Sequence, residues 1–378
     1  MRLDADALRP HYASFLQPGR ILLTGHSHQA WPDVAEQGLR QAFRDAAAHV
    51  DDKWSHAAEA AEAVRSAVVA YHGGTTSQIA LAANTHELLT RLFSALDLRR
   101  RPRFVATTGE FHSIRRQLMR LEEEGIEVCW VDAEPVATLA ERLAAAVTDR
   151  TAALLTSTTL FQTSSVVPHL EVACEAAHAA GAEVVLDAYH HTGIVPWCPV
   201  DAQAYVVGGG YKYLQWGEGC GFMRVPEDCT LRPVITGWFS DFGNLERGIG
   251  LGYGTTHGDR FAGATYDPSS HYRARAVIDH FAACDMTIEN LRETSLAQTE
   301  RILNALDGYE VLTPREGRGG FVTVRIPNAP EIAKKLRAQN VFVDARGDLL
   351  RLGPAPYLRD DEIDAGVHAL KALCPASA

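Results

Sequence analysis

Short apolar runs alternate with amphipathic segments between residues 79 and 225 of this 378-residue chain. Short apolar runs predict strands buried on both faces, whereas apolar residues spaced three or four apart predict helices. The alternation therefore predicts an α/β fold, with a mostly parallel sheet and helices on both of its faces. The predicted strands lie at 79–82, 103–107, 127–131 and 152–157, followed by two strands that lead to Asp187 and Lys212.

The two ends of the chain have other patterns. Alanine-rich segments at 33–48 and 56–72 predict helices, and residues 233–270 lack periodicity, which is typical of a functional or interfacial loop. Beyond it we expect a long helix from about 269 to 306, strands at 310–313, 320–326, 341–345 and 348–352, and helices at 330–338 and 360–373. These patterns predict three parts: an N-terminal segment (1–55) packing with the small domain, a large domain (56–280) and a small α+β C-terminal domain (281–378).

The stretch from Val206 to Leu214 interrupts an apolar run with three glycines and then places Lys212 between Tyr211 and Tyr213. Glycines at a strand end let other groups approach the backbone closely. In apolar and aromatic surroundings, a lysine loses part of its proton affinity and becomes an amine that forms Schiff bases, as pyridoxal phosphate (PLP) enzymes require. The alternative is a structural turn whose lysine points to solvent.

A second apolar run ends in Asp187, 25 residues before Lys212. An acid at the carboxyl end of a parallel strand faces the crevice where ligands of open α/β sheets bind. PLP needs a carboxylate paired with its pyridinium nitrogen. The acid and the lysine together favour the cofactor over the alternative, in which Asp187 caps the following turn.

Polar or aromatic residues in other segments are further candidates for cofactor or substrate contacts, and each has an ordinary structural role as its alternative. Asn84 and Thr85 precede a predicted helix, whose free N–H groups bind a phosphate unless these residues only cap it. Phe111 stacks on a flat ring or belongs to the core. Arg351, beside a Gly-Pro loop, suits bidentate capture of a carboxylate or is a surface charge. Ser27 lies in a polar cluster that contacts substrate or forms a surface loop.

Composition and missing motifs exclude several classes of function. The net charge of −11 argues against nucleic-acid binding or a membrane-surface footprint, and no apolar run approaches the ~20 residues of a membrane span. The first residues lack a signal-peptide pattern, and seven scattered cysteines without a CxxC pair favour free thiols in the cytoplasm. The histidines show no metal-binding spacing, so no metal site is expected. The absence of GxGxxG, P-loop and GxSxG motifs weakens dinucleotide, nucleotide and serine-hydrolase interpretations.

These motifs resemble kynureninase, within the class V aminotransferase superfamily of fold-type I PLP-dependent enzymes. The resemblance covers roughly residues 75–360 and is strongest at DAYH (187–190), YKYL (211–214), GWF (237–239) and RLGPAP (351–356). It implies a mostly parallel seven-stranded sheet flanked by helices, a smaller α+β domain, and a homodimer with shared active sites.

The resemblance also implies a role for each matching residue. Lys212 would hold PLP as a Schiff base and then move the substrate α-proton, with Tyr211 as a second acid/base group. Asp187 would pair with the pyridine nitrogen, and Arg351 would clamp the α-carboxylate of an amino-acid substrate. The other cofactor contacts would be Phe111 on the ring, Ser157 and His190 beside it, and Asn84, Thr85, Tyr211, Trp238 and Thr265 near the phosphate, with Trp238 and Thr265 supplied by the second subunit.

The implied reaction is hydrolysis of L-kynurenine to anthranilate and L-alanine, a step of tryptophan catabolism. The family's Asn-Ser-Leu-Gly loop is replaced here by HSHQ (26–29), and the Gly-His before a downstream Trp is replaced by a different segment (48–54). These departures leave open a related γ-oxo or other β-substituted amino acid. The alternatives are an aminotransferase, epimerase or β-lyase of the same superfamily, or a non-catalytic relic. A cysteine desulfurase lacks support because residues 340–360 contain no cysteine.

Overall fold

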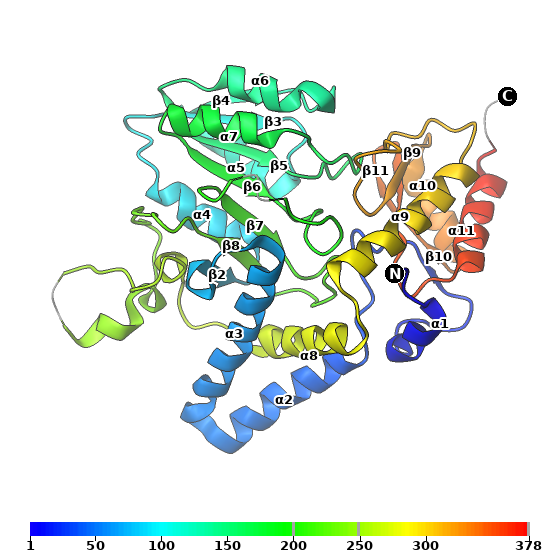
Figure 1. The fold of residues 1–378 in the computed structure, drawn as a ribbon, viewed down its shortest axis with the longest axis horizontal. Helices are drawn as coiled ribbons and strands as arrows, with labels where there is room; N and C mark the ends of the chain where they lie inside the picture. Colours follow the sequence, from blue (N-terminus) through cyan, green and yellow to red (C-terminus); the bar gives the residue numbers. More distant parts are fainter. Residues whose placement is uncertain (199–200, 248–249, 376–378) are drawn as a thin grey trace.

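The computed structural model describes residues 1–198, 201–247 and 250–375. It has a large lobe built on an α/β sheet and a smaller lobe that contains the C-terminal helices (Figure 1). The predicted fold class is confirmed, with a mostly parallel sheet in the large lobe and a separate small sheet near the C-terminus. Within the described ranges, no helix has the length and apolarity needed to cross a lipid bilayer.

Among the described residues, the central sheet of the large lobe has seven strands. Strand β8 runs antiparallel to both of its neighbours, and every other neighbouring pair is parallel. Parallel strands covered on both faces need apolar side chains on both, which explains the continuous apolar runs in the sequence. In sheet order the strands are β2 (Ile79–Ala82), β8 (Gly221–Arg224), β7 (Tyr205–Gly209), β6 (Glu183–Asp187), β5 (Thr151–Ser157), β3 (Arg103–Thr107) and β4 (Glu127–Val131).

Helices cover both faces of this sheet. Successive residues of β6 point to opposite faces, so Val185 packs in one apolar cluster while Val184 and Leu186 pack in another. The first cluster includes α4 (Thr85–Ala95) and α5 (His112–Glu123), and the second includes α6 (Leu139–Ala146) and α7 (Leu170–Ala179). Helices α2 (Val34–His49), α3 (Lys53–His72) and α8 (Ser269–Ala283) pack against one another, and α3 also contacts β2 (Figure 1).

The small lobe contains an antiparallel sheet in the order β11-β12-β9. A separate parallel pair joins β1, near the N-terminus, to β10. The predicted domain limits at residues 55 and 280 stay a prediction. The elements of this part are β1 (Ile21–Leu22), α9 (Ile288–Ala305), β9 (Val322–Arg325), α10 (Ala329–Ala338), β10 (Val341–Phe342), β11 (Asp344–Arg346), β12 (Leu349–Leu352) and α11 (Asp360–Leu373).

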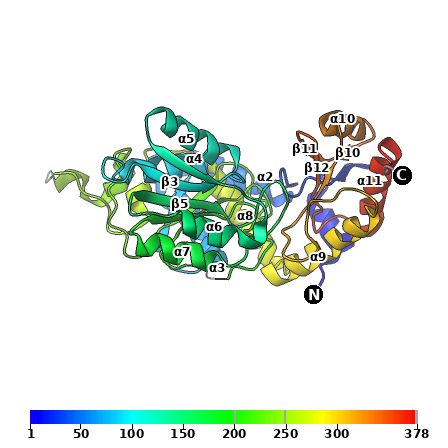
Figure 2. The same cartoon turned by 90° about the horizontal axis from the view of Figure 1, so that it is seen from above.

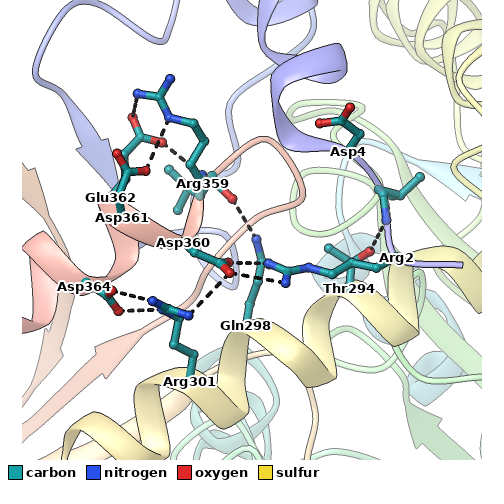
Figure 3. A network of polar contacts seen from close by, with 12 residues as sticks. Arg2, Asp4, Thr294, Gln298, Arg301, Arg359, Asp360, Asp361, Glu362 and Asp364 are labelled. Carbon is teal, nitrogen blue, oxygen red and sulfur yellow. Dashed lines mark hydrogen bonds and ion pairs between the residues drawn. The ribbon is translucent and has the colours of Figure 1, made fainter.

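Polar contacts fasten the first residues, before α1 (Ala5–Leu8), to the small lobe (Figure 3). Arg2 forms an ion pair with Asp360 at the start of α11, and the backbone N–H of Leu3 donates to Oγ1 of Thr294 in α9 at 2.9 Å. Arg301 of α9 also pairs with Asp360, at 3.4 Å. Exposed pairs contribute little one by one, but a network in which two arginines share one carboxylate fixes the position of this end of the chain.

One predicted helix is two helices in the structure. The chain was expected to continue in a single helix from about 269 to 306, but α8 ends at Ala283 and α9 begins at Ile288. Between them, Asp285 has a left-handed backbone (φ 51°), which a helix cannot contain. The side chain of Thr287 then accepts a hydrogen bond from the backbone N–H of Asn290 and caps α9.

Two predicted strands also differ. The strand expected at 341–345 divides into β10 and β11 because its two halves pair with different partners, β1 and β12. The strand expected at 310–313 is reduced to one bridge, between Val311 and Val324. The expected loop at 233–270 contains η5 (Trp238–Arg247), a 3-10 segment that projects from the large lobe away from the small one (Figure 2). Residues 248–249 of that loop lie outside the described residues.

Candidate active site

The carboxyl ends of neighbouring parallel strands meet at one edge of the large sheet. Ser157 ends β5 and Asp187 ends β6, and the two are register partners. The chain winds from β3 to β4 in one direction and from β5 toward β7 in the other, so the strand order reverses between β3 and β5, beside this pair. Open α/β sheets bind ligands at such a reversal. A cavity at this edge is lined by eight of the predicted residues: Asn84, Thr85, Phe111, Ser157, Asp187, His190, Tyr211 and Lys212.

Lys212 follows the end of β7 and is buried among aromatic rings. Its Nζ atom lies 4.7 Å from the ring centre of Tyr189 and 5.4 Å from that of Phe111. It also lies 2.6 Å from Nε2 of His190. Burial lowers the pKa of Lys212 to about 7, because the charged amine loses its hydration. Near neutral pH, a large share of this lysine is therefore the neutral amine, which is its nucleophilic form.

Asp187 faces the same cavity with its carboxyl group buried. Its Oδ1 atom accepts a hydrogen bond from the backbone N–H of Tyr189 at 2.8 Å. Burial raises the pKa of Asp187, while that hydrogen bond and the charge of Lys212 act in the opposite direction. A cationic ring nitrogen placed against this carboxyl group would favour its ionised form further.

The N-terminus of α4 also opens toward this cavity. Asn84 caps the helix, with its Oδ1 accepting a hydrogen bond from the backbone N–H of Glu87 at 3.0 Å. Gly221 of β8 lets the cap lie directly on the sheet, because a Cβ atom at this position would come within 2.6 Å of the carbonyl carbon of Asn84. The other free N–H groups of the first helical turn and the helix dipole favour an anion at this end.

Glu110 is a site residue that we did not predict from the sequence. It is fully buried below the cavity, where its Oε1 atom accepts a hydrogen bond from the backbone N–H of Ser157 and its Oε2 atom lies 2.9 Å from Oγ of Ser157. Burial, together with the nearby charge of Asp187, raises the pKa of Glu110 to about 8. No pattern in the sequence indicates this burial, because an acid in a polar Gly-Glu-Phe-His loop has the pattern of a surface residue.

Arg351 approaches the site from β12 of the small lobe. It is buried and donates from Nη1 to the backbone oxygen of Phe161 at 2.5 Å. Its Nε atom donates to Oδ2 of Asp344 at 2.8 Å, and the two residues are directly opposite in the β11–β12 pair. The ring of Phe161 packs edge-on against Phe111, so one residue contacts both the arginine and the cofactor cavity. Neither Asp344 nor Phe161 was predicted.

The polar HSHQ segment (26–29) lies close to the part of the small lobe that carries Arg351. A bridge between Thr24 and Gly353 joins it to the chain just beyond β12. Ser27 is buried and donates from Oγ to the backbone oxygen of Thr24 at 3.2 Å. Its neighbour His26 is fully buried, with its ring stacked on Phe321 at 4.5 Å. Ser27 itself does not line the cavity around Lys212.

Two predicted cofactor residues lie away from Lys212 within this chain. Trp238 is 44% exposed in η5, and its ring is tilted against that of Phe239 with the ring centres 4.5 Å apart. Thr265 lines a separate hollow between α3 and the start of α8. Neither residue lines the cavity around Lys212, so any contact with the cofactor would have to come from a second subunit. Among the described residues, no group of His, Cys, Asp and Glu side chains is arranged to hold a metal ion.

The fold of the whole chain is similar to that of several solved structures. They include a mutant of C-DES with glycine covalently linked to its PLP cofactor (17% identity, covering 96% of this chain and 98% of that one, TM-score 0.84). The apo cysteine desulfurase from Thermococcus onnurineus NA1 (18% identity, 99% and 98% coverage, TM-score 0.83) and the cysteine desulfurase CsdA from Escherichia coli (15% identity, 98% of both chains, TM-score 0.81) are also similar. The chain therefore has the fold-type I architecture seen in these structures, the first of which carries a PLP cofactor.

The small lobe is also similar to one particular protein family. Residues 289–370 match the family model of the Kynureninase C-terminal domain, and this segment contains α9 to α11 together with Arg351. Among curated protein sequences, none matches the chain. The expected resemblance to kynureninase is thus confirmed for residues 289–370, and the expected fold is confirmed for the whole chain.

Proposed function

We propose that this protein is a PLP-dependent hydrolase of the kynureninase type, which cleaves L-kynurenine or a related γ-oxo amino acid. The proposal is supported best by the presence of a lysine–aspartate pair and a substrate-binding arginine in one chain. A buried Lys212 with a lowered pKa lies beside Asp187 in a PLP-enzyme fold, and Arg351 is supplied by a segment that matches the Kynureninase C-terminal domain. Fold alone does not define a reaction, so the proposal depends on these side chains.

The donor set of the cavity fits PLP. The amine of Lys212 suits the aldehyde of the cofactor, and the carboxyl group of Asp187 suits the ring nitrogen. The free N–H groups at Asn84 and Thr85 suit the phosphate, and the ring of Phe111 suits a flat aromatic face. The aldehyde, the ring nitrogen, the phosphate and the ring face of the cofactor thus each have a chemically matched partner, although these residues come from four different segments of the chain.

The side chains of the site would bind the substrate and transfer its protons. When bound, PLP withdraws electrons from the substrate's Cα, so that its proton becomes acidic. Lys212 takes that proton at Nζ, and Arg351 holds the α-carboxylate, which orients the Cα–H bond. Burial raises the pKa of Tyr211, so its hydroxyl group stays protonated and can donate a proton. Water adds to the γ-carbonyl and the Cβ–Cγ bond breaks. The products are anthranilate, which keeps the added oxygen, and L-alanine, which gains a proton at Cβ from the water and regains at Cα the proton that Lys212 took.

A β-lyase acting on another amino acid is the second candidate. The HSHQ segment (26–29) differs from the kynureninase loop, and the solved structures of similar fold include the cystine C–S lyase C-DES in complex with cysteine persulfide (18% identity, TM-score 0.82). An aminotransferase or epimerase is distinguished by its products. We further propose a cytoplasmic homodimer that shares its active sites, because Trp238 and Thr265 lie away from the cavity within one chain and the seven cysteines are unpaired.

Incubation of the purified, PLP-loaded protein with L-kynurenine tests the proposal. We expect anthranilate fluorescence and an equal amount of L-alanine, and no product from Lys212→Ala. Borohydride reduction of the coloured protein should attach the cofactor to Lys212, as located by peptide mapping. Attachment at another lysine would refute the site. A label on Lys212 together with no anthranilate from L-kynurenine would support the cofactor site and favour the β-lyase over the hydrolase.

A further inference from the structure

The guanidinium group of Arg351 is already occupied by groups of its own chain. Its Nε and Nη2 atoms both contact Oδ2 of Asp344, and its Nη1 atom donates to the backbone oxygen of Phe161. Only 2% of Arg351 is exposed, so little of the group is left for water. Asp344 therefore presents to Arg351 the same chemical group, a carboxylate, that a substrate amino acid would present.

A second partner for Asp344 lies close by. Nε2 of His26 is 3.7 Å from the same Oδ2 atom, and both ring nitrogens of His26 are buried without a hydrogen-bond partner among the described residues. The loop that carries His26 is joined to the end of β12 through the Thr24–Gly353 bridge. A buried polar group without a partner is costly, so His26 gains stability from any carboxylate that moves onto it.

The protonation states of His26 and Asp344 define the two ends of such an exchange. Burial lowers the pKa of His26 to about 3, so the ring is neutral and offers one N–H donor at either nitrogen, together with one acceptor. The pKa of Asp344 is held well below its ordinary range by His26 and Arg351, although burial acts in the opposite direction. Asp344 thus stays ionised, and it competes for Arg351 with its full charge.

We propose that Asp344 is a specificity-determining residue that occupies Arg351 in the substrate-free protein and yields it to the α-carboxylate of the substrate. The displaced carboxyl group of Asp344 then turns to His26. This inference rests on the proposed role of Arg351. If Arg351 is free in only a fraction of the molecules, the apparent affinity for a carboxylate is reduced in proportion to that fraction. Asp344 therefore weakens the binding of every carboxylate and does not affect ligands without one.

Two probes separate this effect from a general change in the site. L-Alanine carries the α-carboxylate, and ethylamine is the same molecule without it. Binding of each to the PLP-loaded protein is followed by the change in cofactor absorbance. We expect Asp344→Asn to tighten L-alanine binding by about fivefold or more, because a neutral amide holds Arg351 less strongly than a carboxylate does, and to leave ethylamine unchanged.

A matched variant controls for net charge. Asp307→Asn removes the same charge from an exposed position of the small lobe and should change the binding of neither probe. His26→Phe keeps a ring against Phe321 but removes both nitrogens, so we expect it to weaken L-alanine binding and to spare ethylamine. This second variant keeps the inference testable if Asp344→Asn does not fold.

The outcomes distinguish the inference from the function on which it rests. Arg351→Ala should weaken L-alanine binding, and an unchanged affinity would refute the carboxylate role of Arg351 itself. If Arg351→Ala weakens binding but Asp344→Asn also weakens it or leaves it unchanged, Asp344 only positions the arginine and the inference fails. Tighter binding of both probes by Asp344→Asn would likewise overturn it, because the effect would not depend on the carboxylate.

Discussion

Glu110 and Asp187 are two buried acids, of which Asp187 lines the cavity and Glu110 is hydrogen-bonded to the cavity residue Ser157, and they differ in their neighbours. Asp187 lies near the amine of Lys212, whose charge favours the carboxylate. The carboxyl group of Glu110 is hydrogen-bonded to Ser157, and no cation among the described residues lowers its pKa, so burial keeps it protonated to a higher pH. With a neutral Glu110, the negative charge of the pocket floor is concentrated on Asp187, where a ring nitrogen would bind.

Replacing Glu110 by glutamine should therefore change how stability depends on pH. The pKa of Glu110 is raised to about 8 in the folded protein, so its stabilising protonated form is fully present below the unfolded pKa near 4.5 and is lost as pH rises through 8. We expect Glu110→Gln to match the wild type near pH 5 and to be more stable by on the order of a few kcal/mol above pH 8.

Urea unfolding of the PLP-free protein between pH 5 and pH 9 measures this difference. Glu175→Gln, on the exposed face of α7, removes the same charge and should follow the wild type throughout. A parallel pH dependence for Glu110→Gln and the wild type would show that Glu110 titrates normally.

At the scale of the element, the capped start of α4 should contribute to both folding and binding. Asn84→Ala removes the hydrogen bond to the N–H of Glu87 and should cost about 1 kcal/mol of the free energy of unfolding. It should also weaken PLP binding, because Asn84 lines the cavity.

Thr287→Ala is the matched control, since Thr287 caps α9 in the same way but lies in the other lobe. Urea unfolding and PLP titration of both variants separate the two roles. We expect similar losses of stability, with weaker PLP binding for Asn84→Ala alone. Equal PLP affinity in the two variants would mean that the start of α4 is only a cap.

At the scale of the molecule, large apolar side chains are exposed in η5 and in the loop residues on either side of it, on the part of the large lobe that projects away from the small one (Figure 2). Exposed apolar side chains that gather in one region are typical of an interface. The exposed residues are Val234, Ile235, Trp238, Phe242, Leu245 and Leu251.

Trp238→Ala should therefore reduce dimer formation, measured by sedimentation, and weaken PLP binding in the same protein. Loss of the indole ring removes apolar area from the expected contact between subunits. Val172→Ala, at an exposed apolar position on α7, should change neither quantity. A stable dimer with unchanged PLP affinity would remove Trp238 from the shared site.

The sequence alone determined the α/β fold class and the gathering of Asp187 and Lys212. Burial on both faces demands apolar strands, and the carboxyl ends of parallel strands meet at one edge. Tertiary structure decided the rest. Glu110 meets the backbone N–H of Ser157 because the loop after β3 packs against the end of β5, and Asp344 meets Arg351 because β11 and β12 pair in one register. No local pattern in the sequence marks these contacts, so the charge and the partner of each residue depend on packing.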